Sequence, residues 1–210
     1  MNKLGDLSCN EFLTELASAA PAPGGGGGAA MAGALAAALA SMVANLTIGK
    51  EKFADREPEV KELLEQAEAE RVRLLTLVDE DAAVFNSFMS FYKLPKATDE
   101  EKAARTAAIR AAAKQAATVP LNIARSSFAV LKLADRLVVS GNPSVITDGA
   151  CSGLLARAAL RCAEYNVRIN LGLTKDEVWN AQAAADLKQL LADAEALEAR
   201  LLAVTDKALQ

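Results

Sequence analysis

The sequence predicts an all-α protein. Hydrophobic residues make up 52% of its 210 residues and aromatic residues only 4%, so the apolar content is mostly Ala and Leu. These residues favour helices over strands. Apolar residues recur three and four positions apart over long segments, and no convincing alternating strand is present. We therefore expect one domain over residues 1–210, a bundle of long helices around a buried Ala- and Gly-rich helix.

Helix starts and ends are marked by local signals. Three residue pairs have the spacing of a capping box: Ser8 and Glu11, Thr98 and Glu101, and Thr174 and Glu177. The expected helices span about residues 9–19, 28–47, 58–92, 98–118, 120–140, 148–171 and 175–208. Pro21 and Pro23 end the first helix, and Pro120 either kinks the fourth or starts the next. The segment "SGNPSVITD", residues 140–148, is expected to be a loop.

The composition excludes several kinds of chemistry. The chain has no histidine, so a Ser-His-Asp triad and a His-ligated zinc site are impossible. Its net charge of −4 without a basic stripe disfavours nucleic-acid binding. Cys9, Cys151 and Cys162 lack the spacing of a metal site. Their odd number and the absence of a secretory leader favour the reducing cytoplasm.

An uncharged run from Leu16 to Gly49 is long enough to cross a membrane. It consists largely of Ala and Gly, which gain little from entering lipid, and no Lys or Arg cluster flanks it. We therefore interpret it as a helix buried on all sides within the protein and expect no membrane partner.

Five consecutive glycines precede this apolar helix. They match neither a P-loop nor a dinucleotide fingerprint, because Glu51 follows Lys50 and because "PAP" stands where a strand is required. Two interpretations remain open. Backbone N–H groups at the helix start can receive a ligand, or the glycines form a tight bend that allows close helix packing.

Three further polar segments are candidates for function. Asn45 and Lys50 are polar groups at the end of the apolar helix, where Lys50 either acts in proton transfer or complements the helix dipole. Asp79, Glu80 and Asp81 lie within a helix beside an aromatic run, and one of the three is expected to face inward, while a solvated position suits Glu80 best. The third segment contains Asn142, Thr147 and Asp148, where Asp148 is either an N-cap or a functional carboxylate.

Five segments together resemble one family. They are "PAPGGGGGAAMAGALAAALASMVANLTIGK", "DEDAAVFNSFMSFYKLPKATDEEKAAR", "VPLNIAR", "GNPSVITD" and "NVRINL". Their order and content are similar to those of the formiminotetrahydrofolate cyclodeaminase and methenyltetrahydrofolate cyclohydrolase family. The resemblance implies an all-α homodimer that acts on one-carbon units carried by tetrahydrofolate, with no metal or redox cofactor.

Two activities occur among the proteins that the chain resembles. Cyclodeaminases close 5-formiminotetrahydrofolate to 5,10-methenyltetrahydrofolate and release ammonia. Cyclohydrolases add water to the methenyl bridge to give 10-formyltetrahydrofolate. Cyclodeaminase-type sequences typically carry Ser after the third glycine, where this chain has Gly27. We therefore expect a cyclohydrolase, with a cyclodeaminase and a non-catalytic folate-binding protein as the alternatives.

The resemblance leads to a hypothesis for the site. Asp148 or Asp81 would accept the proton of the attacking water, and Lys50 would serve the departing nitrogen or the carbinolamine oxygen. Other residues are expected to bind the folate: Gly24, Gly25, Gly26 and Gly27 through backbone N–H groups, and Asn45, Asn142 and Thr147 through their side chains.

Overall fold

The computed structural model describes residues 3–210, which form six α-helices and three short 3₁₀ turns and contain no strand. The α-helices are α1 (Cys9–Leu16), α2 (Gly25–Asn45), α3 (Glu57–Phe91), α4 (Asp99–Ser140), α5 (Ile146–Leu171) and α6 (Glu177–Ala208). The 3₁₀ turns are η1 (Leu4–Asp6), η2 (Glu51–Phe53) and η3 (Pro143–Val145). The all-α prediction is confirmed.

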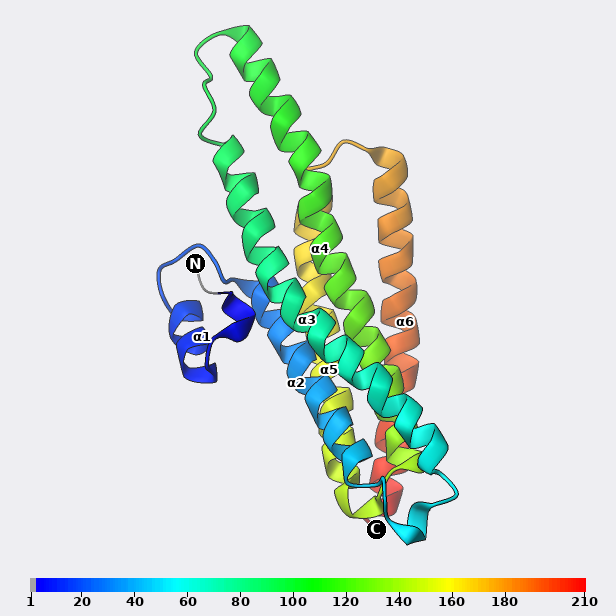
Figure 1. Cartoon of the computed structure of the whole chain (residues 1–210). Helices are drawn as coiled ribbons and strands as arrows, with labels where there is room; N and C mark the ends of the chain where they lie inside the picture. Colours follow the sequence, from blue (N-terminus) through cyan, green and yellow to red (C-terminus); the bar gives the residue numbers. More distant parts are fainter. Residues whose placement is uncertain (1–2) are drawn as a thin grey trace.

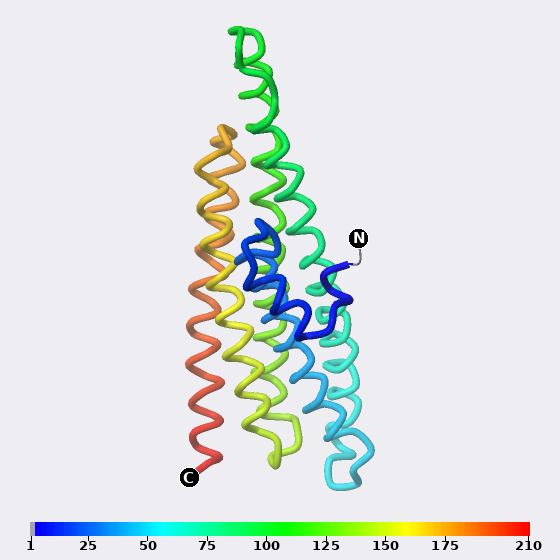
Figure 2. The backbone as a smooth tube through the Cα atoms, turned by 90° about the vertical axis from the view of Figure 1, so that its left-hand side faces the viewer, coloured from blue at the N-terminus to red at the C-terminus, as the bar shows by residue number. Residues whose placement is uncertain are grey.

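The five long helices run alternately down and up the bundle (Figure 1). Helices α2 and α5 are antiparallel neighbours, and the hairpin of α3 and α4 extends beyond the end of α6. Figure 2 shows α2 and α5 side by side on one face, with the α1 segment in front of the upper part of α2. This arrangement leaves the glycine-rich start of α2 partway along the bundle, against α3, α4 and α5.

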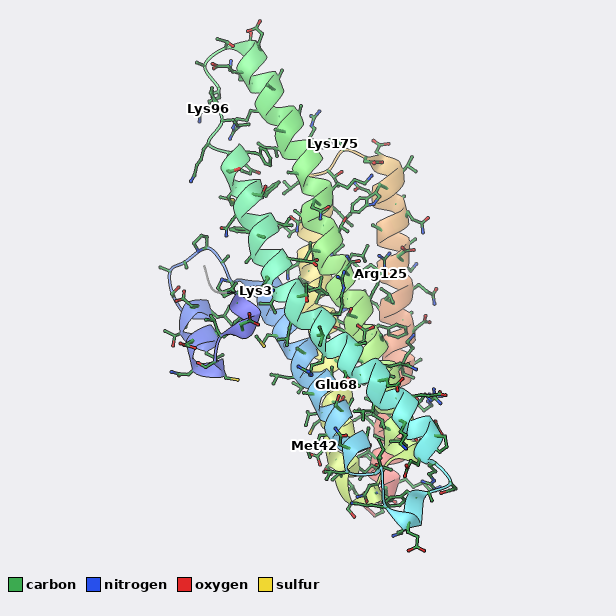
Figure 3. The ribbon with its side chains drawn as sticks, in the orientation of Figure 1. Lys3, Met42, Glu68, Lys96, Arg125 and Lys175 are labelled. Atoms are coloured by element: carbon green, nitrogen blue, oxygen red, sulfur yellow. The ribbon has the colours of Figure 1, made fainter. Side chains whose placement is uncertain are left out.

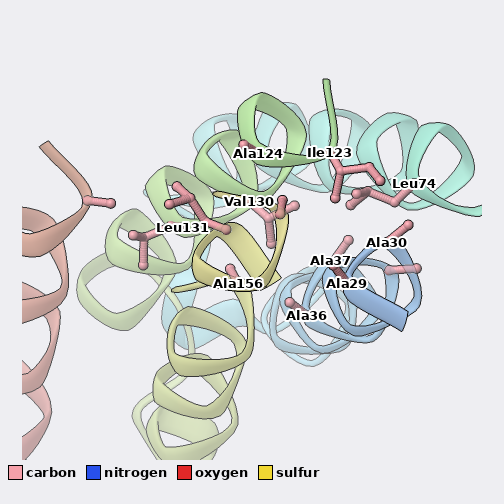
Figure 4. Packing of buried hydrophobic residues seen from close by; sticks show 14 of the residues in the cluster. Ala29, Ala30, Ala36, Ala37, Leu74, Ile123, Ala124, Val130, Leu131 and Ala156 are labelled. Carbon is pink, nitrogen blue, oxygen red and sulfur yellow. The ribbon is translucent and has the colours of Figure 1, made fainter. Parts of the chain in front are cut away.

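Small residues allow α2 to pack closely with its neighbours. Ala30, Ala36 and Ala37 are fully buried, and the view in Figure 4 shows them near side chains of α3, α4 and α5. At Gly33 an added Cβ would lie 3.0 Å from both Leu74 Cδ2 and Ser127 Oγ. A larger residue there would separate α2 from α3 and α4, which explains the composition of this helix.

Among the described residues, α2 is the one helix with the length and composition of a membrane span. However, 61% of its apolar window is buried inside the protein, against α3, α4 and α5. A core helix meets the same length and hydropathy criteria, so this feature is weak evidence for a membrane.

Three local predictions were wrong. Helix α2 begins at Gly25, so most of the glycine run lies inside the helix and does not form a bend before it. Helix α4 continues through Pro120, so residues 98–118 and 120–140 belong to one helix and Pro120 does not start a new one. The third capping box does not form, because the side chain of Asp176 caps α6 by accepting a hydrogen bond from Trp179 N. The other two capping boxes, at Ser8 and Thr98, are confirmed.

Candidate active site

A pocket of about 340 Å³ lies at the N-terminal end of α2, where α3, α4 and α5 converge. Its volume is within the range usual for small-molecule sites, ~300–1,000 Å³. The residues that line it are Pro21, Ala22, Gly24, Gly25, Gly26, Asp81, Val84, Phe85, Phe88, Ala116, Val119, Asn166, Ile169, Asn170 and Leu173. The walls are therefore mostly apolar, with a few polar groups at defined positions.

Asp81 is the one residue with an ionisable side chain among the described residues that line the pocket. Burial raises the pKa of this carboxyl, and a hydrogen bond from the backbone of Gly27 partly opposes the rise. A carboxylate in such surroundings keeps a free lone pair and is a stronger base than an exposed aspartate. The position and the direction of the pKa shift make Asp81 the candidate general base.

The glycines bring the backbone of α2 against this carboxylate. An added Cβ at Gly26 would lie 2.6 Å from Asp81 Cγ, far inside van der Waals contact. Gly25, Gly26 and Gly27 are the first three residues of α2, so their N–H groups have no acceptor within the helix. These groups lie at the positive end of the helix dipole, which attracts a negative charge. The glycine run thus lets α2 approach the Asp81 carboxylate closely. The expected close packing is confirmed and the expected bend is not formed, while the binding of a ligand by these N–H groups stays a prediction.

The three consecutive acidic residues of α3 have different surroundings. Asp79 Oδ1 accepts hydrogen bonds from Leu4 N at 2.6 Å and Gly5 N at 3.4 Å, and so holds the N-terminal turn η1 against α3. Glu80 faces outward and pairs with Arg73 at 3.5 Å. Asp81 alone lines the pocket. The expectation that one of the three faces inward is confirmed by Asp81.

Two asparagines of α5, one helical turn apart, form the opposite wall. Asn166 Nδ2 donates to the carbonyl of Cys162 at 2.9 Å. Asn170 Nδ2 donates to the carbonyls of Ala116 and Asn166, each at 2.9 Å. Because the amide hydrogens are used in this way, each side chain has its Oδ1 left as an acceptor.

Aromatic and aliphatic side chains complete the pocket. Phe88 is buried and packs edge-to-face against Tyr92, with ring centroids 5.4 Å apart. Phe85 lies one turn earlier on α3 and is 37% exposed. Ile169 on α5 is 70% exposed, although it lines the pocket. A flat heterocycle can be held between such surfaces while its polar edge faces Asp81 or the two asparagines.

The remaining predicted site residues lie at the other end of α2. Lys50 and Asn45 are exposed beside the C-terminal end of this helix. An α-helix rises ~1.5 Å per residue, so the 21 residues of α2 separate them from Asp81 by roughly 30 Å. Asn45 lies on an apolar helix and yet is exposed, because none of the other described helices covers that side of α2.

Asn142 has a structural role in the chain. It is buried, its backbone N–H donates to Thr47 Oγ1 at 2.9 Å, and its Nδ2 donates to the carbonyl of Leu46 at 3.1 Å. These bonds attach the loop before α5 to the end of α2. Asp148 is half-buried in the first turn of α5 and does not cap it, because α5 begins at Ile146; Thr147 is exposed. The structure therefore brings Asp81 together with Gly24–Gly27 and leaves the other predicted residues apart from them.

Several residues of the pocket were not predicted from the sequence. Asn166 and Asn170 stand in "NVRINL", where their spacing of four places both amides on one side of a helix. Phe85 and Phe88 have a similar spacing. The described residues contain no group of three or more His, Cys, Asp or Glu side chains that could hold a metal ion.

The sequence matches the model of the formiminotransferase-cyclodeaminase family over residues 8–189. With this match, the all-α fold and the pocket at the glycine-rich helix, the chain belongs to that family.

Two groups of curated relatives differ in length and identity. The methenyltetrahydrofolate cyclohydrolase of Methylorubrum extorquens is 44% identical over 197 residues, which cover 94% of this chain and 95% of that protein. The formimidoyltransferase-cyclodeaminase of Rattus norvegicus is 34% identical over 94% of this chain, but the match covers only 36% of the rat protein. Among solved structures, the formiminotetrahydrofolate cyclodeaminase of Thermotoga maritima superposes with a TM-score of 0.87 at 30% identity, covering 98% of both chains.

Proposed function

We propose that the protein is a methenyltetrahydrofolate cyclohydrolase, which hydrolyses 5,10-methenyltetrahydrofolate to 10-formyltetrahydrofolate. The observation that carries this proposal is the half-buried carboxylate of Asp81, whose pKa is raised by burial, in a pocket whose other described lining residues are uncharged. The methenyl bridge is cationic, and a lone carboxylate in a weakly polar pocket attracts a cation strongly. The 44% identity with a cyclohydrolase over almost the full length of both chains supports the same activity.

The proposed reaction needs one group that moves a proton twice. Asp81 takes a proton from water as the water oxygen bonds to the bridge carbon and the C=N electron pair moves onto nitrogen. The result is a neutral carbinolamine. The bond from its carbon to N5 then breaks, N5 receives the proton held by Asp81, and the hydroxyl proton leaves to solvent. One water is consumed and one proton is released, which balances the conversion of the cation to the neutral formyl product.

The pocket supplies the surroundings for these steps. Phe85 and Phe88 provide apolar surface for the pterin, and the two asparagines provide acceptors for its N–H groups. Neither step requires a metal or a redox cofactor, so we propose that the enzyme works without one. We also propose that it acts in the reducing cytoplasm, where its three free cysteines stay reduced.

An absorbance assay with two substrates tests the function. Enzyme-dependent loss of the methenyl chromophore, without methenyl formation from 5-formiminotetrahydrofolate, supports the cyclohydrolase. Appearance of methenyltetrahydrofolate and ammonia from the formimino substrate identifies a cyclodeaminase, as in the structurally similar T. maritima protein. Rates no higher than in the enzyme-free control, together with folate binding, identify a non-catalytic binding protein.

We further propose that the chain works as a homodimer, paired through α2. Leu35, Met42 and Leu46 are 51%, 40% and 38% exposed and follow one side of this uncharged helix. Met42 lies on the side of α2 that faces away from α4 and α6 (Figure 3). Helix α5, which packs against α2, also has an exposed leucine, Leu154. An apolar stripe without charges fits a second copy of itself, as a two-fold interface requires.

This pairing would bring the two groups of predicted site residues together. Leu35 lies ten residues from both Gly25 and Asn45, at the middle of α2. A two-fold axis at Leu35 would therefore place Asn45 of one subunit beside Gly25 of the other. Lys50 would then lie near the glycine-rich end of the partner's α2, where its ammonium group can donate a hydrogen bond to the carbinolamine oxygen, the second of the two roles predicted for it.

The oligomeric state tests the pairing. We expect the wild-type mass in light scattering to be twice 22.0 kDa, and Leu35→Glu to give a folded monomer with little activity. Val72→Glu is the matched control, because Val72 is 55% exposed on α3 and lies outside the α2 stripe. A wild-type monomer with full activity would overturn the proposal.

A further inference from the structure

Helix α4 contains a proline where the helix would otherwise use an N–H. In an α-helix the N–H of residue 120 donates to the carbonyl of residue 116. Pro120 has no N–H, so the Ala116 carbonyl lacks its ordinary helical donor. Ala116 lines the pocket, and a carbonyl at such a position needs another partner.

That partner comes from the neighbouring helix. Asn170 Nδ2 donates to the Ala116 carbonyl at 2.9 Å and, with its other hydrogen, to the Asn166 carbonyl at 2.9 Å. Both amide hydrogens are thus directed at backbone oxygens. Rotating the amide by 180° would place Oδ1 against those two carbonyl oxygens, which is repulsive. The side chain of Asn170 is therefore fixed in one orientation.

In this orientation Oδ1 of Asn170 faces away from the two carbonyls and has no hydrogen-bond partner within the described chain. Asn170 lines the pocket, and its Oδ1 is not among the described polar atoms that are both buried and unpaired. The oxygen is thus open to a ligand. Together with Asn166 Oδ1 and Asp81, it gives the pocket side chains that accept hydrogen bonds, and the described residues of this chain that line the pocket include no cationic side chain.

We propose that Pro120 is a positioning residue. By freeing the Ala116 carbonyl it fixes the Asn170 amide, so that Oδ1 accepts a hydrogen bond from an N–H of the bound pterin. A reduced pterin ring carries several N–H donors, on its 2-amino group and at ring nitrogens, which suit such a row of acceptors. This inference rests on the proposed folate substrate and adds the group that binds its ring.

Substitutions at both positions test the proposal. Asn170→Ala removes the acceptor, and we expect the KM for methenyltetrahydrofolate to rise roughly tenfold, with kcat within about twofold of wild type. Pro120→Ala returns an N–H to the Ala116 carbonyl and lets the Asn170 amide rotate. We expect its KM to rise about threefold to tenfold, although the protein becomes no less stable, because Ala is the better helix former. A merely structural proline would change stability without this change in KM.

The double variant provides the decisive comparison. If Pro120 acts only through Asn170, Pro120→Ala/Asn170→Ala has the same KM as Asn170→Ala alone. The proposal would be overturned if the increases in KM of the two single variants added up in the double variant. A Pro120→Ala protein with the KM of the wild type would also overturn it. Pro58→Ala and Asn10→Ala are matched controls, since both residues are exposed and line no part of the pocket. Asn170→Ser is the second variant if Asn170→Ala fails to fold.

Binding measured without turnover separates this inference from the proposed function. Calorimetry with 5-formyltetrahydrofolate gives the Kd of each variant directly. A wild-type protein that binds this folate but hydrolyses no methenyltetrahydrofolate contradicts the proposed function alone, and the Kd series still tests Asn170 and Pro120. Normal wild-type turnover with an unchanged Kd in Asn170→Ala contradicts this inference alone.

Discussion

The carboxylate of Asp81 lies directly against the backbone of Gly26, so that a Cβ at position 26 would be 2.6 Å from Asp81 Cγ. Two residues that are distant in the sequence, one on α2 and one on α3, thus meet at a point where only glycine fits. The contact explains why a glycine run stands at the start of a core helix, where its propensity is poor.

Gly26→Ala is therefore expected to displace the Asp81 carboxylate and to lower kcat/KM at least tenfold. The free energy of unfolding, measured by urea unfolding, should change by only about 1 kcal/mol. Gly28→Ala is the matched control, because an added Cβ there would meet only Leu16 Cδ2, at 3.9 Å. We expect that variant to keep its activity and to gain up to ~1 kcal/mol of stability. Wild-type activity in Gly26→Ala would contradict the assigned position of Asp81.

Asp81→Asn is expected to lower kcat about 10²- to 10⁴-fold and to stabilise the protein at neutral pH. Burial raises the pKa of Asp81 above its ordinary 3.8, so the folded state binds this proton more tightly than the unfolded state. The wild-type free energy of unfolding therefore falls as the pH rises from about the unfolded pKa through the raised folded pKa. Above the folded pKa the wild-type protein has lost this part of its free energy of unfolding completely. Asp81→Asn has no carboxyl group to ionise and therefore does not lose it.

Urea unfolding of both proteins at neutral pH and near pH 4 measures this difference. The variant's advantage should be present at neutral pH and become small in acid. An Asp81→Asn protein that is less stable than wild type at neutral pH would show that the carboxylate is stabilised rather than strained by its surroundings.

The fold followed from local patterns, but parts of the site depend on contacts that only the tertiary structure creates. Apolar periodicity located the long helices, apart from the interruption expected at Pro120, and two capping boxes marked the starts of α1 and α4. At Pro120 the local rule predicts an interruption, whereas Asn170 from another helix supplies a donor to the Ala116 carbonyl. At Gly25–Gly27 the helix propensity is poor, but close packing against α3 and α5 compensates.

Grouping polar residues into one site was the weaker inference. Asn142 and Lys50 looked like site residues because each follows an apolar helix beside glycine or proline. In the folded chain Asn142 instead bonds Thr47 and Leu46 and closes the end of the bundle. Nothing in a single sequence shows that the length of α2 lies between this end and Asp81.

Gly27→Ser is expected to shift the pH profile of the enzyme. An added Cβ at Gly27 would lie 3.9 Å from Asp81 Oδ2, so a serine hydroxyl can donate a hydrogen bond to the carboxylate. That bond favours the charged form and lowers the pKa of Asp81 relative to wild type. The acid limb of the profile of kcat against pH should move to lower pH, and the plateau rate should fall because the base is weaker.

Gly27→Ala is the matched control for this shift. In both variants the Cβ approaches Pro23 Cβ to 3.3 Å, so both need the same small adjustment, but alanine brings no hydroxyl. Equal pH profiles in the two variants would exclude a hydrogen bond from position 27 to Asp81.

The dimer model makes a prediction about mixed subunits. Asp81→Asn and Lys50→Met homodimers are each expected to be nearly inactive. If Lys50 serves the site of its partner, a heterodimer of the two variants has one intact site, made of Asp81 from one subunit and Lys50 from the other. Equal mixing with subunit exchange should then restore about a quarter of the wild-type activity, because half of the dimers are mixed and half of their sites are intact.

If Lys50 served its own subunit, both sites of the heterodimer would lack one group and mixing would restore nothing. Full activity in Lys50→Met alone would remove Lys50 from the mechanism, and Lys52→Met, at an exposed lysine two residues away, controls for the loss of local charge.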